Sequence, residues 1–489
     1  MKKSFLMLGL ALVLFVGFTA AVTARYESVQ PVVEPVPEVT IPDGAAQRLA
    51  GSLRMPTISS ENPAAFDAEA FRALHAYLQA AFPRVHAQLR REVVGTHSLL
   101  YTWQGSDPSL EAILLSGHLD VVPVETGTHN TWQQDPFGGQ IVDGFIWGRG
   151  AIDNKSAVLG TLEAVEMLLV QGFRPVRTVY LAYGHDEEVG GTAGAREIAA
   201  LLKTRGVALE MVLDEGGVIT DGLLPGITGP VALVGIAEKG FVTIELSARV
   251  AGGHSSLPPR QTAVGILGAA VARLENTQMA VRLETPTREL FDRIGPRFPT
   301  MRRAVFANLW LTTPLVLRSL EESPTTNAMV RTTMAPTIFQ AGTKDNVLPS
   351  YARAVINFRI LPGDTIASVL EHVKRAIDDR RVEVRIAGRF SSEPSAVSDS
   401  NSASFRTLER TIRSVVPDAI VAPYLVVVAT DARYYSDLSR NVFRFLPLRL
   451  TQLDVERMHG PNERIGIREY ETAIRIYRQI VLELTGNGR

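Results

Sequence analysis

The sequence predicts an α/β protein in which a mostly parallel sheet is covered by helices and a smaller α+β domain is inserted. Three observations support this prediction. Strands and helices alternate from residue 43 to about 235. From about residue 237, strands with one polar face follow. The alternation of strands and helices resumes at about residue 401. The 489 residues suffice for two or three domains of about 150 residues each.

The N-terminus, residues 1–24, carries a membrane anchor or a signal peptide. Lys2 and Lys3 precede an uncharged apolar run, Phe5–Val22. This run is longer than the ~7–15 residues of a usual signal core and slightly shorter than the ~20 that span a bilayer, so both alternatives stay open. The preceding lysines favour a cytoplasmic N-terminus, which places the body outside the cytoplasm in the periplasm, a lumen or the medium. We expect the proline-rich residues 25–42 to form a spacer that holds the catalytic part off the membrane.

Residues 43–232 are expected to form the first part of the catalytic domain. Short apolar strands are predicted at Glu111–Ser116, Thr178–Tyr183 and Glu210–Leu213, and helices at Ser156–Gln171 and Ala193–Lys203. Strands that alternate with helices form parallel sheets covered on both faces.

Residues 233–390 are expected to form the inserted domain, and residues 391–489 the second part of the catalytic domain. The insert combines strands at Phe241–Val250, Ala352–Ile360 and Val382–Ile386 with helices at Thr262–Leu274 and Ser368–Asp379. The second catalytic part contains helices at Phe405–Ser414 and Glu469–Leu484 and a strand at Ala422–Val428. Within the insert, the apolar segment Phe291–Lys344 is an elaborated lid, a partner surface or ordinary core helices.

The composition excludes several classes of protein. Lys and Arg number 50 against 51 Asp and Glu, which argues against a nucleic-acid binder that works through a broad basic surface. The chain has no cysteine, which rules out disulfides, thiolate metal sites and cysteine nucleophiles.

Acidic residues and histidines gather in five short stretches, most of them directly after predicted strands. In open α/β sheets, ligands bind beyond the carboxyl ends of the strands. Five such clusters together therefore indicate a site. The stretches are Ser116–Asp120, Gly148–Asp153, His185–Glu188, Val212–Gly216 and Met458–Glu463.

These residue types suit a site for two metal ions. Imidazole and carboxylate groups bind zinc or a related divalent ion, and one carboxylate can bridge two ions. Asp120 lies two residues after His118, on the same side of an extended chain, and can accept the second ring N–H of that histidine. Of the neighbours Glu187 and Glu188, one can bind metal while the other takes a proton from water. The candidate ligands are His118, Asp153, Glu188, Asp214 and His459.

From about Leu49 to the C-terminus, these stretches resemble the co-catalytic zinc peptidases and deacylases, such as aminoacylase, glutamate carboxypeptidase and the desuccinylases. The resemblance implies a zinc exopeptidase-like fold and two zinc ions per subunit, with Co²⁺ or Mn²⁺ as possible substitutes. It implies that His118 and Asp214 bind one ion, Glu188 and His459 bind the other, and Asp153 bridges them. It also implies that Glu187 is the general base and that the Asp153–Asn154 peptide is cis.

The same resemblance assigns the substrate side. The insert would be a lid through which two subunits form a homodimer, and His254 would reach the neighbouring active site and stabilise the oxyanion. Asn346 and Arg359 would hold the carboxylate and carbonyl of the substrate. Taken singly, without the resemblance, His254 is better explained as a capping or loop histidine and Arg359 as an arginine on a surface strand.

Two further stretches, Thr332–Gly342 and Thr430–Tyr435, are most similar to the branch with carboxypeptidase S and the N-fatty-acyl-amino acid synthase/hydrolases. This implies hydrolysis or formation of the amide of an N-acyl amino acid. Arg433 is a candidate for the α-carboxylate, or else part of a structural ion pair. Ala304–Leu317 could line an acyl slot or simply pack in the core. The rivals are a dipeptidase or carboxypeptidase with the same site, and a non-catalytic exported metal-dependent binding protein.

Overall fold

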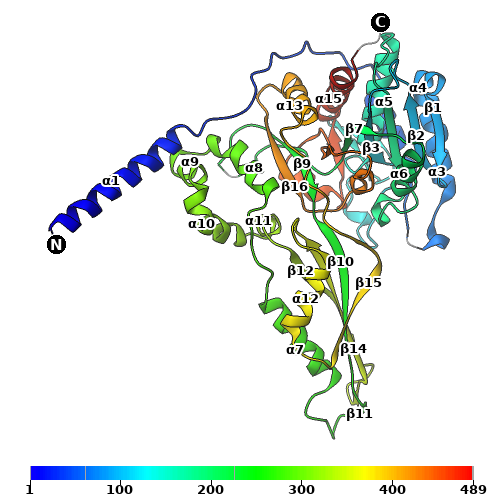
Figure 1. Cartoon of the computed structure of the whole chain (residues 1–489). Coiled ribbons are helices and arrows are strands. Elements are labelled where there is room, and N and C mark those ends of the chain that lie inside the picture. The colour runs from blue at the N-terminus through cyan, green and yellow to red at the C-terminus, as the bar shows by residue number, and fades with distance from the viewer. Residues whose placement is uncertain (1, 61, 225, 487–489) are drawn as a thin grey trace.

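The computed structural model describes residues 2–60, 62–224 and 226–486 (Figure 1). In this part of the chain, ten strands form one large sheet in the order β1-β2-β6-β3-β7-β17-β9-β8-β18, with β16 also paired to β9. The strands are β1 (Arg90–Val94), β2 (Ser98–Trp103), β3 (Ala112–His118), β6 (Val179–Gly184), β7 (Leu209–Asp214), β8 (Ile219–Thr220), β9 (Val231–Glu238), β16 (Ile420–Val426), β17 (Val442–Arg444) and β18 (Arg449–Leu450).

The centre of this sheet is parallel. β3 pairs in parallel with both β6 and β7, and β7 pairs in parallel with β17. β3 is buried along its whole length, which agrees with its apolar sequence. Because these strands run in one direction, their carboxyl ends, at His118, Gly184 and Asp214, meet at one edge of the sheet. The predicted fold class is confirmed.

Helices cover both faces of the large sheet. One face packs against α2 (Ala45–Ser52), α3 (Ala68–Ala81), α4 (Pro83–Gln88), α5 (Lys155–Val170), α13 (Ala403–Val415) and α15 (Ile467–Thr485). The other packs against α6 (Ala195–Thr204) and the 3-10 turn Asp431–Tyr435. α5 is buried on nearly all sides because α15 and the sheet enclose it, and its sequence is correspondingly apolar all round.

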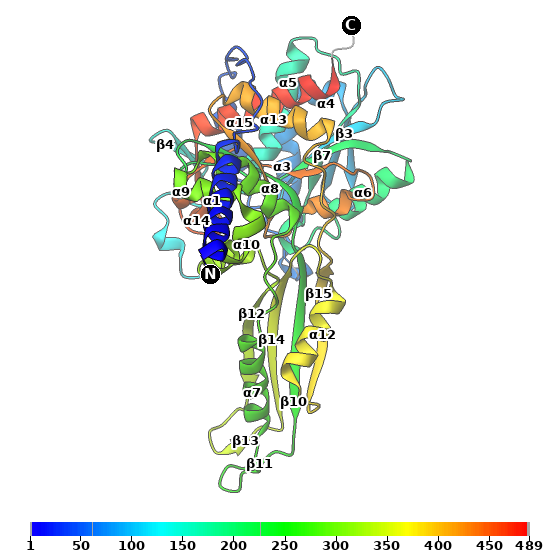
Figure 2. The ribbon, with the colours of Figure 1, turned by 60° about the vertical axis from the view of Figure 1, so that its left-hand side comes forward.

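A second, antiparallel sheet of order β12-β14-β10-β15 extends away from the body as a lid (Figure 2). Its strands are β10 (Gly240–Arg249), β12 (Thr333–Ala341), β14 (Tyr351–Ile360) and β15 (Val382–Ser392), and α7 (Ala263–Asn276) and α12 (Ile366–Ile377) pack on one face. β14 alternates strictly between buried and half-buried side chains, so Phe358 faces the helices and Arg359 faces away from them. The small strands β11 (Gly253–His254) and β13 (Val347–Leu348) pair at the tip.

The helices between α7 and β12 pack on the large sheet and not on the lid sheet, although they fall within the segment 233–390 expected to form the lid. They are α8 (Thr285–Ile294), α9 (Thr300–Ala307), α10 (Leu309–Glu321) and α11 (Pro324–Ala328). Leu290 and Phe291 of the amphipathic α8 are buried in one cluster with Leu233 of β9 and Ile420 of β16. Burial of these apolar side chains against the strands removes them from water, which stabilises this arrangement.

The N-terminal segment is a long apolar helix, α1 (Lys2–Ala24), followed by a stretch without helix or strand. That stretch was expected to hold the body off the membrane, but it lies along the body. The Gln30 amide donates to the Val421 carbonyl (2.8 Å) and accepts from its N–H (2.9 Å), and the Val36 N–H donates to Ser414 (2.9 Å). The body is therefore held close to α1.

A three-stranded sheet of order β19-β5-β4 joins two loops of the site. It consists of β4 (Gln140–Val142), β5 (Phe145–Trp147) and β19 (Arg464–Gly466), and α14 (Gln452–Arg457) precedes β19. Because β19 pairs with β5, the loop before β19 lies beside the loop after β5. This pairing brings His459 to Asp153 across more than half of the chain.

Candidate active site

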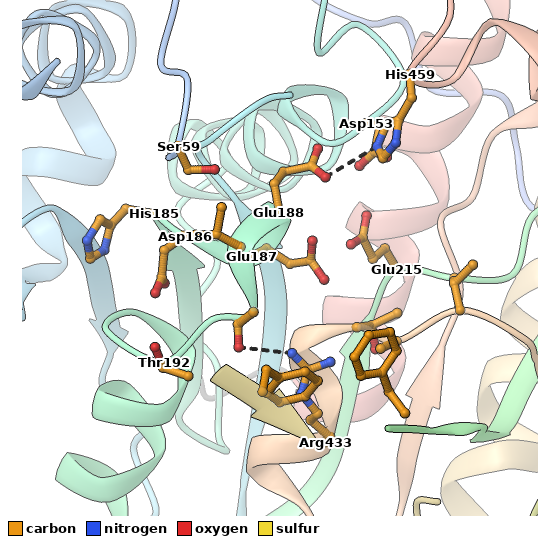
Figure 3. Close-up of a pocket in the computed structure, with 18 of the residues that line it drawn as sticks. Ser59, Asp153, His185, Asp186, Glu187, Glu188, Thr192, Glu215, Arg433 and His459 are labelled. Carbon is orange, nitrogen blue, oxygen red and sulfur yellow. Dashed lines mark hydrogen bonds and ion pairs between the residues drawn. The ribbon is translucent and has the colours of Figure 1, made fainter. Parts of the chain in front are cut away.

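Acidic residues and histidines gather at the edge where the parallel strands end (Figure 3). His118 is the last residue of β3, Glu187 and Glu188 follow β6, and Asp153 precedes α5. His459 comes from the loop after α14.

The carboxylate of Asp153 lies between two imidazoles. Its Oδ1 is 2.9 Å from His118 Nε2, and its Oδ2 is 3.1 Å from His459 Nε2. Glu188 Oε2 lies 3.3 Å from the same atom of His459. Burial opposes the ionisation of Asp153, but hydrogen bonds with both histidines outweigh it and lower its pKa. Asp153 and Glu188 in turn raise the pKa of His459 to about 10.

On the other side of His118 lies Glu215 and not Asp214. His118 Nε2 is 3.4 Å from Glu215 Oε1, and the Asn154 amide donates to Glu215 Oε2 at 2.5 Å. Asp214 ends β7 as a buried residue, its neighbouring charges include Arg444, Glu238 and His118, and its Oδ2 has no hydrogen-bond partner among the described residues. The strand ends at Asp214, and Glu215 lies in the bend that follows, which brings its carboxylate to His118. Glu215, which was not among the expected ligands, is therefore the acid that the structure places within reach of His118, and the ligand role expected for Asp214 stays a prediction.

Asp120 connects three residues of the site. The Asp120 carbonyl accepts from His118 Nδ1 at 3.0 Å, and its carboxylate lies 3.3 Å from the same nitrogen. Because a carbonyl oxygen only accepts, Nδ1 carries a proton, and Nε2 is the ring nitrogen that faces Asp153 and Glu215 and would bind a metal ion once deprotonated. The Asp120 carboxylate also accepts the backbone N–H groups of Glu187 and Glu188, each at 3.1 Å.

Glu187 projects into the space between these groups. One carboxylate oxygen of Glu187, one of Glu215 and a ring nitrogen of His118 lie within 4.8 Å of one another. Burial, followed by the charge of Glu215, raises the pKa of Glu187 well above its ordinary value. A carboxyl group with a raised pKa can exchange protons near neutral pH.

A buried ion pair holds the Asp153 loop to the His459 loop. Arg149 Nη1 donates to Glu463 Oε2 at 2.7 Å, and Nη2 donates to the His459 carbonyl at 3.0 Å. The Glu463 carboxylate also accepts three backbone N–H groups of the other loop, at 3.0, 2.8 and 3.1 Å, from Gly150, Ile152 and Asp153. The ion pair of Arg149 and Glu463 therefore fixes the loop that carries Asp153 relative to the loop that carries His459.

A cavity of about 1020 Å³ opens beside the cluster and is lined by both the body and the lid. The Arg433 guanidinium lies 4.6 Å over the Phe390 ring, and its Nη2 donates to the Gly190 carbonyl at 3.0 Å. Its buried Nε and Nη1 have no hydrogen-bond partner among the described residues. Arg359 of the lid lines the same cavity, and burial together with Arg433 lowers its pKa. Two guanidinium groups with free donors suit an anionic ligand.

The donor set fits divalent metal ions. His118 with Glu187 and Glu215, and His118 with Asp153 and Glu188, form two groups whose ligand atoms are close enough to share an ion. The buried Glu188 Oε1 has no partner among the described residues. Imidazole and carboxylate donors suit zinc, and cations would offset the repulsion between these carboxylates.

Residues 114–483 match the model of peptidase family M20/M25/M40. The chain belongs to this family. It is accordingly a metal-dependent hydrolase of the metallopeptidase type, which acts on peptide or linear amide bonds.

Curated relatives cover nearly the same length. The probable carboxypeptidase S-like 2 of Dictyostelium discoideum is 42% identical, over 97% of this chain and 92% of its own. The human N-fatty-acyl-amino acid synthase/hydrolase PM20D1 is 39% identical, over 89% and 86%. Carboxypeptidase S of Saccharomyces cerevisiae is 30% identical, over 90% and 84%.

Solved structures agree with the M20 fold. The metallo-carboxypeptidase Sso-CP2 of Sulfolobus solfataricus superposes with a TM-score of 0.66 at 19% identity, over 90% of this chain and 99% of its own. Human carnosine dipeptidase 1 gives 0.63 at 17% identity, over 91% and 96%.

Two substrate-side residues of this M20 chain lie away from the cavity. His254 and Asn346 are both at the tip of the lid, where the Ser255 N–H donates to the Asn346 carbonyl at 3.2 Å. Both are exposed, and the tip lies at the far end of the lid from the body (Figure 2). Four residues were expected on the substrate side. Within a single chain, Arg359 and Arg433 line the cavity beside the cluster, whereas His254 and Asn346 do not.

The sequence analysis missed Glu215, Arg149 and Glu463. Glu215 was visible as the second acid of the Asp214–Glu215 pair, and the other two lie within the stretches singled out. What could have pointed to these three residues is that each is a charged residue in a loop that is otherwise apolar or rich in glycine. Nothing in the linear sequence paired Arg149 with Glu463, which lies more than three hundred positions later.

Proposed function

We propose that this M20 hydrolase cleaves, or in reverse forms, the amide bond between a long-chain acyl group and a free amino acid. The observation that carries the proposal is Arg433, which lines the same cavity as the histidine and carboxylate cluster and whose Nε and Nη1 have no hydrogen-bond partner among the described residues. They can bind the free carboxylate of the amino acid by a bidentate contact. Apolar side chains for an acyl chain line the same cavity, among them Phe66, Phe241, Phe390, Leu446 and Met458.

The cluster would hold two zinc ions, with Co²⁺ or Mn²⁺ as substitutes. Asp153 would bridge them, His118 and Glu215 would bind one, and Glu188 and His459 would bind the other. When bound, zinc supplies a water of lowered pKa and a Lewis acid for the amide carbonyl.

In this mechanism, Glu187 accepts a proton from the attacking water and returns it to the leaving nitrogen. Asp120 keeps His118 in the tautomer with a free Nε2 and positions the backbone of Glu187. Arg433 orients the substrate by its carboxylate. In a homodimer, the partner subunit's His254 would donate a hydrogen bond to the oxyanion.

We further propose that α1 anchors the enzyme in a membrane with the body outside the cytoplasm. Among the described residues, Lys3–Ala24 is the one helix long and apolar enough to cross a bilayer, and it has no buried residue in its apolar window. Two lysines at its start favour this orientation.

The test is a substrate panel given to the purified full chain loaded with zinc. We expect release of amino acid from long-chain N-acyl amino acids, loss of turnover with chelator, and recovery when zinc is restored. The methyl ester of the same substrate lacks the carboxylate, so kcat/KM should fall by about 10-fold or more, the loss of one charged contact. Arg433→Ala should erase this preference for the free acid.

A second candidate, a carboxypeptidase or dipeptidase with the same site, is favoured by the relatives named carboxypeptidase S. A carboxypeptidase or dipeptidase also requires a substrate with a free carboxylate. The two functions are therefore distinguished by the group on the other side of the scissile amide, a long acyl chain or an amino acid. Cleavage of dipeptides with no turnover of long-chain acyl substrates would overturn the first proposal and support the second.

A further inference from the structure

The helix α10 carries apolar side chains on two opposite sides. Leu309 and Val316 are 6% and 5% exposed and belong to the core beneath the helix. On the outside, Trp310, Leu311 and Leu315 are 59%, 46% and 62% exposed. Met301 of the neighbouring α9 is 82% exposed. A surface helix normally turns polar residues outward, so this apolar face indicates a contact with something other than water.

The apolar helix α1 touches this same face. The rings of Phe15 and Phe18 meet the Trp310 ring edge-on, with centroids 6.2 and 6.0 Å apart. The Asn308 amide, between α9 and α10, donates to Thr23 Oγ1 at 3.1 Å. The C-terminal end of α1 lies against α9, and the helix extends from there away from the body (Figure 1). The position of α1 relative to these helices is thus set by side-chain contacts.

These contacts lie well inside the apolar length of α1. At 1.5 Å per residue, Phe18 and Phe15 stand about 9 and 14 Å before the end of the helix at Ala24. The hydrocarbon core of a bilayer is about 30 Å thick. If α1 spans it, Trp310 lies at the depth of the leaflet that faces the body.

Polar contacts mark where the membrane would end. Directly after α1, the Tyr26 hydroxyl donates to the Phe291 carbonyl at 2.6 Å, and Arg303 donates to the Tyr26 carbonyl at 2.7 Å. Arg25 stands at the same level. Tyrosine and arginine are the residues that gather at the headgroup level of membrane proteins.

We propose that the apolar face of α9 and α10, formed by Met301, Trp310, Leu311 and Leu315, is embedded in the bilayer leaflet next to the body. This rests on the proposed membrane span of α1 and adds to it a second point of attachment. The body then lies directly on the membrane, in agreement with the short tether of residues 25–42 along its surface. The occupant of the apolar face is lipid.

The absence of cysteine in the chain allows a direct test by depth-dependent quenching. The variants Leu315→Cys in α10, Leu12→Cys in α1 and Val170→Cys at the end of α5 each place one fluorophore on an exposed apolar position. The full-length proteins are reconstituted in phosphatidylcholine vesicles that contain lipid with a nitroxide on the acyl chain. We expect several-fold stronger quenching at positions 315 and 12 than at 170. Leu311→Cys repeats the measurement on a second exposed side chain.

Two results would overturn the proposal in different ways. Quenching at position 12 with position 315 equal to 170 would show that α10 is in water or covered by a second copy, while α1 still spans the membrane. No quenching at position 12 or 315 would reject the membrane span of α1 as well.

Discussion

At the scale of single residues, the neighbours Asp214 and Glu215 have the same charge and different surroundings. Glu215 lies 3.4 Å from His118 and accepts from Asn154, whereas Asp214 ends a buried strand, where Arg444 and Glu238 lie close to it in addition to His118. Which of them would bind metal follows from the direction in which each side chain leaves the backbone.

Glu215→Gln should therefore lower zinc affinity by at least about 10-fold, because it removes a charged ligand atom from the cluster. Asp214→Asn should lower it less. Metal content after dialysis against a graded zinc buffer measures both, with circular dichroism as the control for folding. Loss of zinc from Asp214→Asn alone would return the ligand role to Asp214.

Glu187→Gln should reduce turnover by about 10²- to 10⁴-fold with metal content unchanged, because the amide cannot take up the proton of the attacking water. The matched control is Glu197→Gln on the exposed side of α6, which should retain full activity. Metal analysis accompanies both assays. A variant at position 187 that loses zinc along with turnover would make Glu187 a ligand instead of a base.

At the scale of elements, the pairing of β19 with β5 sets the geometry of the site. It places two loops from distant parts of the chain in register, and the buried pair of Arg149 and Glu463 then joins them. Both charged groups are fully buried and satisfied mainly by each other and by backbone groups. Removing one partner leaves the other charge buried and unpaired.

Glu463→Ala should lower the free energy of unfolding by about 3–5 kcal/mol, the cost of leaving a buried charge without its partner. The exposed pair of Lys203 and Asp437 supplies the control, and Asp437→Asn should cost about 1 kcal/mol or less. Thermal denaturation is followed with chelator present, so that metal binding does not add to stability. Equal losses in the two variants would show that the pair does not hold the site.

At the scale of the whole molecule, the predicted substrate-binding residues of one chain lie at opposite ends of the lid. Arg359 is at its base and lines the cavity, whereas His254 and Asn346 are at its tip, far from the body (Figure 2). A second subunit would supply these residues only if its tip reached this cavity. Such an arrangement makes each active site dependent on two chains.

Mixed dimers test this arrangement. His254→Ala and Glu187→Gln should each be inactive alone, yet equal amounts mixed during refolding should regain about a quarter of wild-type activity. Half of the random dimers are mixed, and each has one complete site, with Glu187 from one chain and His254 from the other. No recovery, although mass spectrometry detects mixed dimers, would mean that His254 does not act across subunits.

Much of this protein could be predicted from local patterns. The period-two alternation of β14 and the apolar run of β3 identified these strands, and the cis peptide at Asp153–Asn154 agrees with the prediction from the resemblance. Acids and histidines after parallel strands predicted a site at their carboxyl edge, because parallel strands end together. These features depend on residues close in sequence or on the direction of a strand.

Other features required the tertiary structure. The sequence singled out the apolar segment Phe291–Lys344 but not the surface against which its helices pack, since burial depends on which apolar face is nearby. The choice between Asp214 and Glu215 depended on how the chain turns after β7, and the partner of Arg149 on a strand pairing over three hundred residues apart. By itself, the sequence determined the fold class and the chemistry available at the site. Only the tertiary structure decided which of those groups face one another, because long-range contacts set the direction of each side chain.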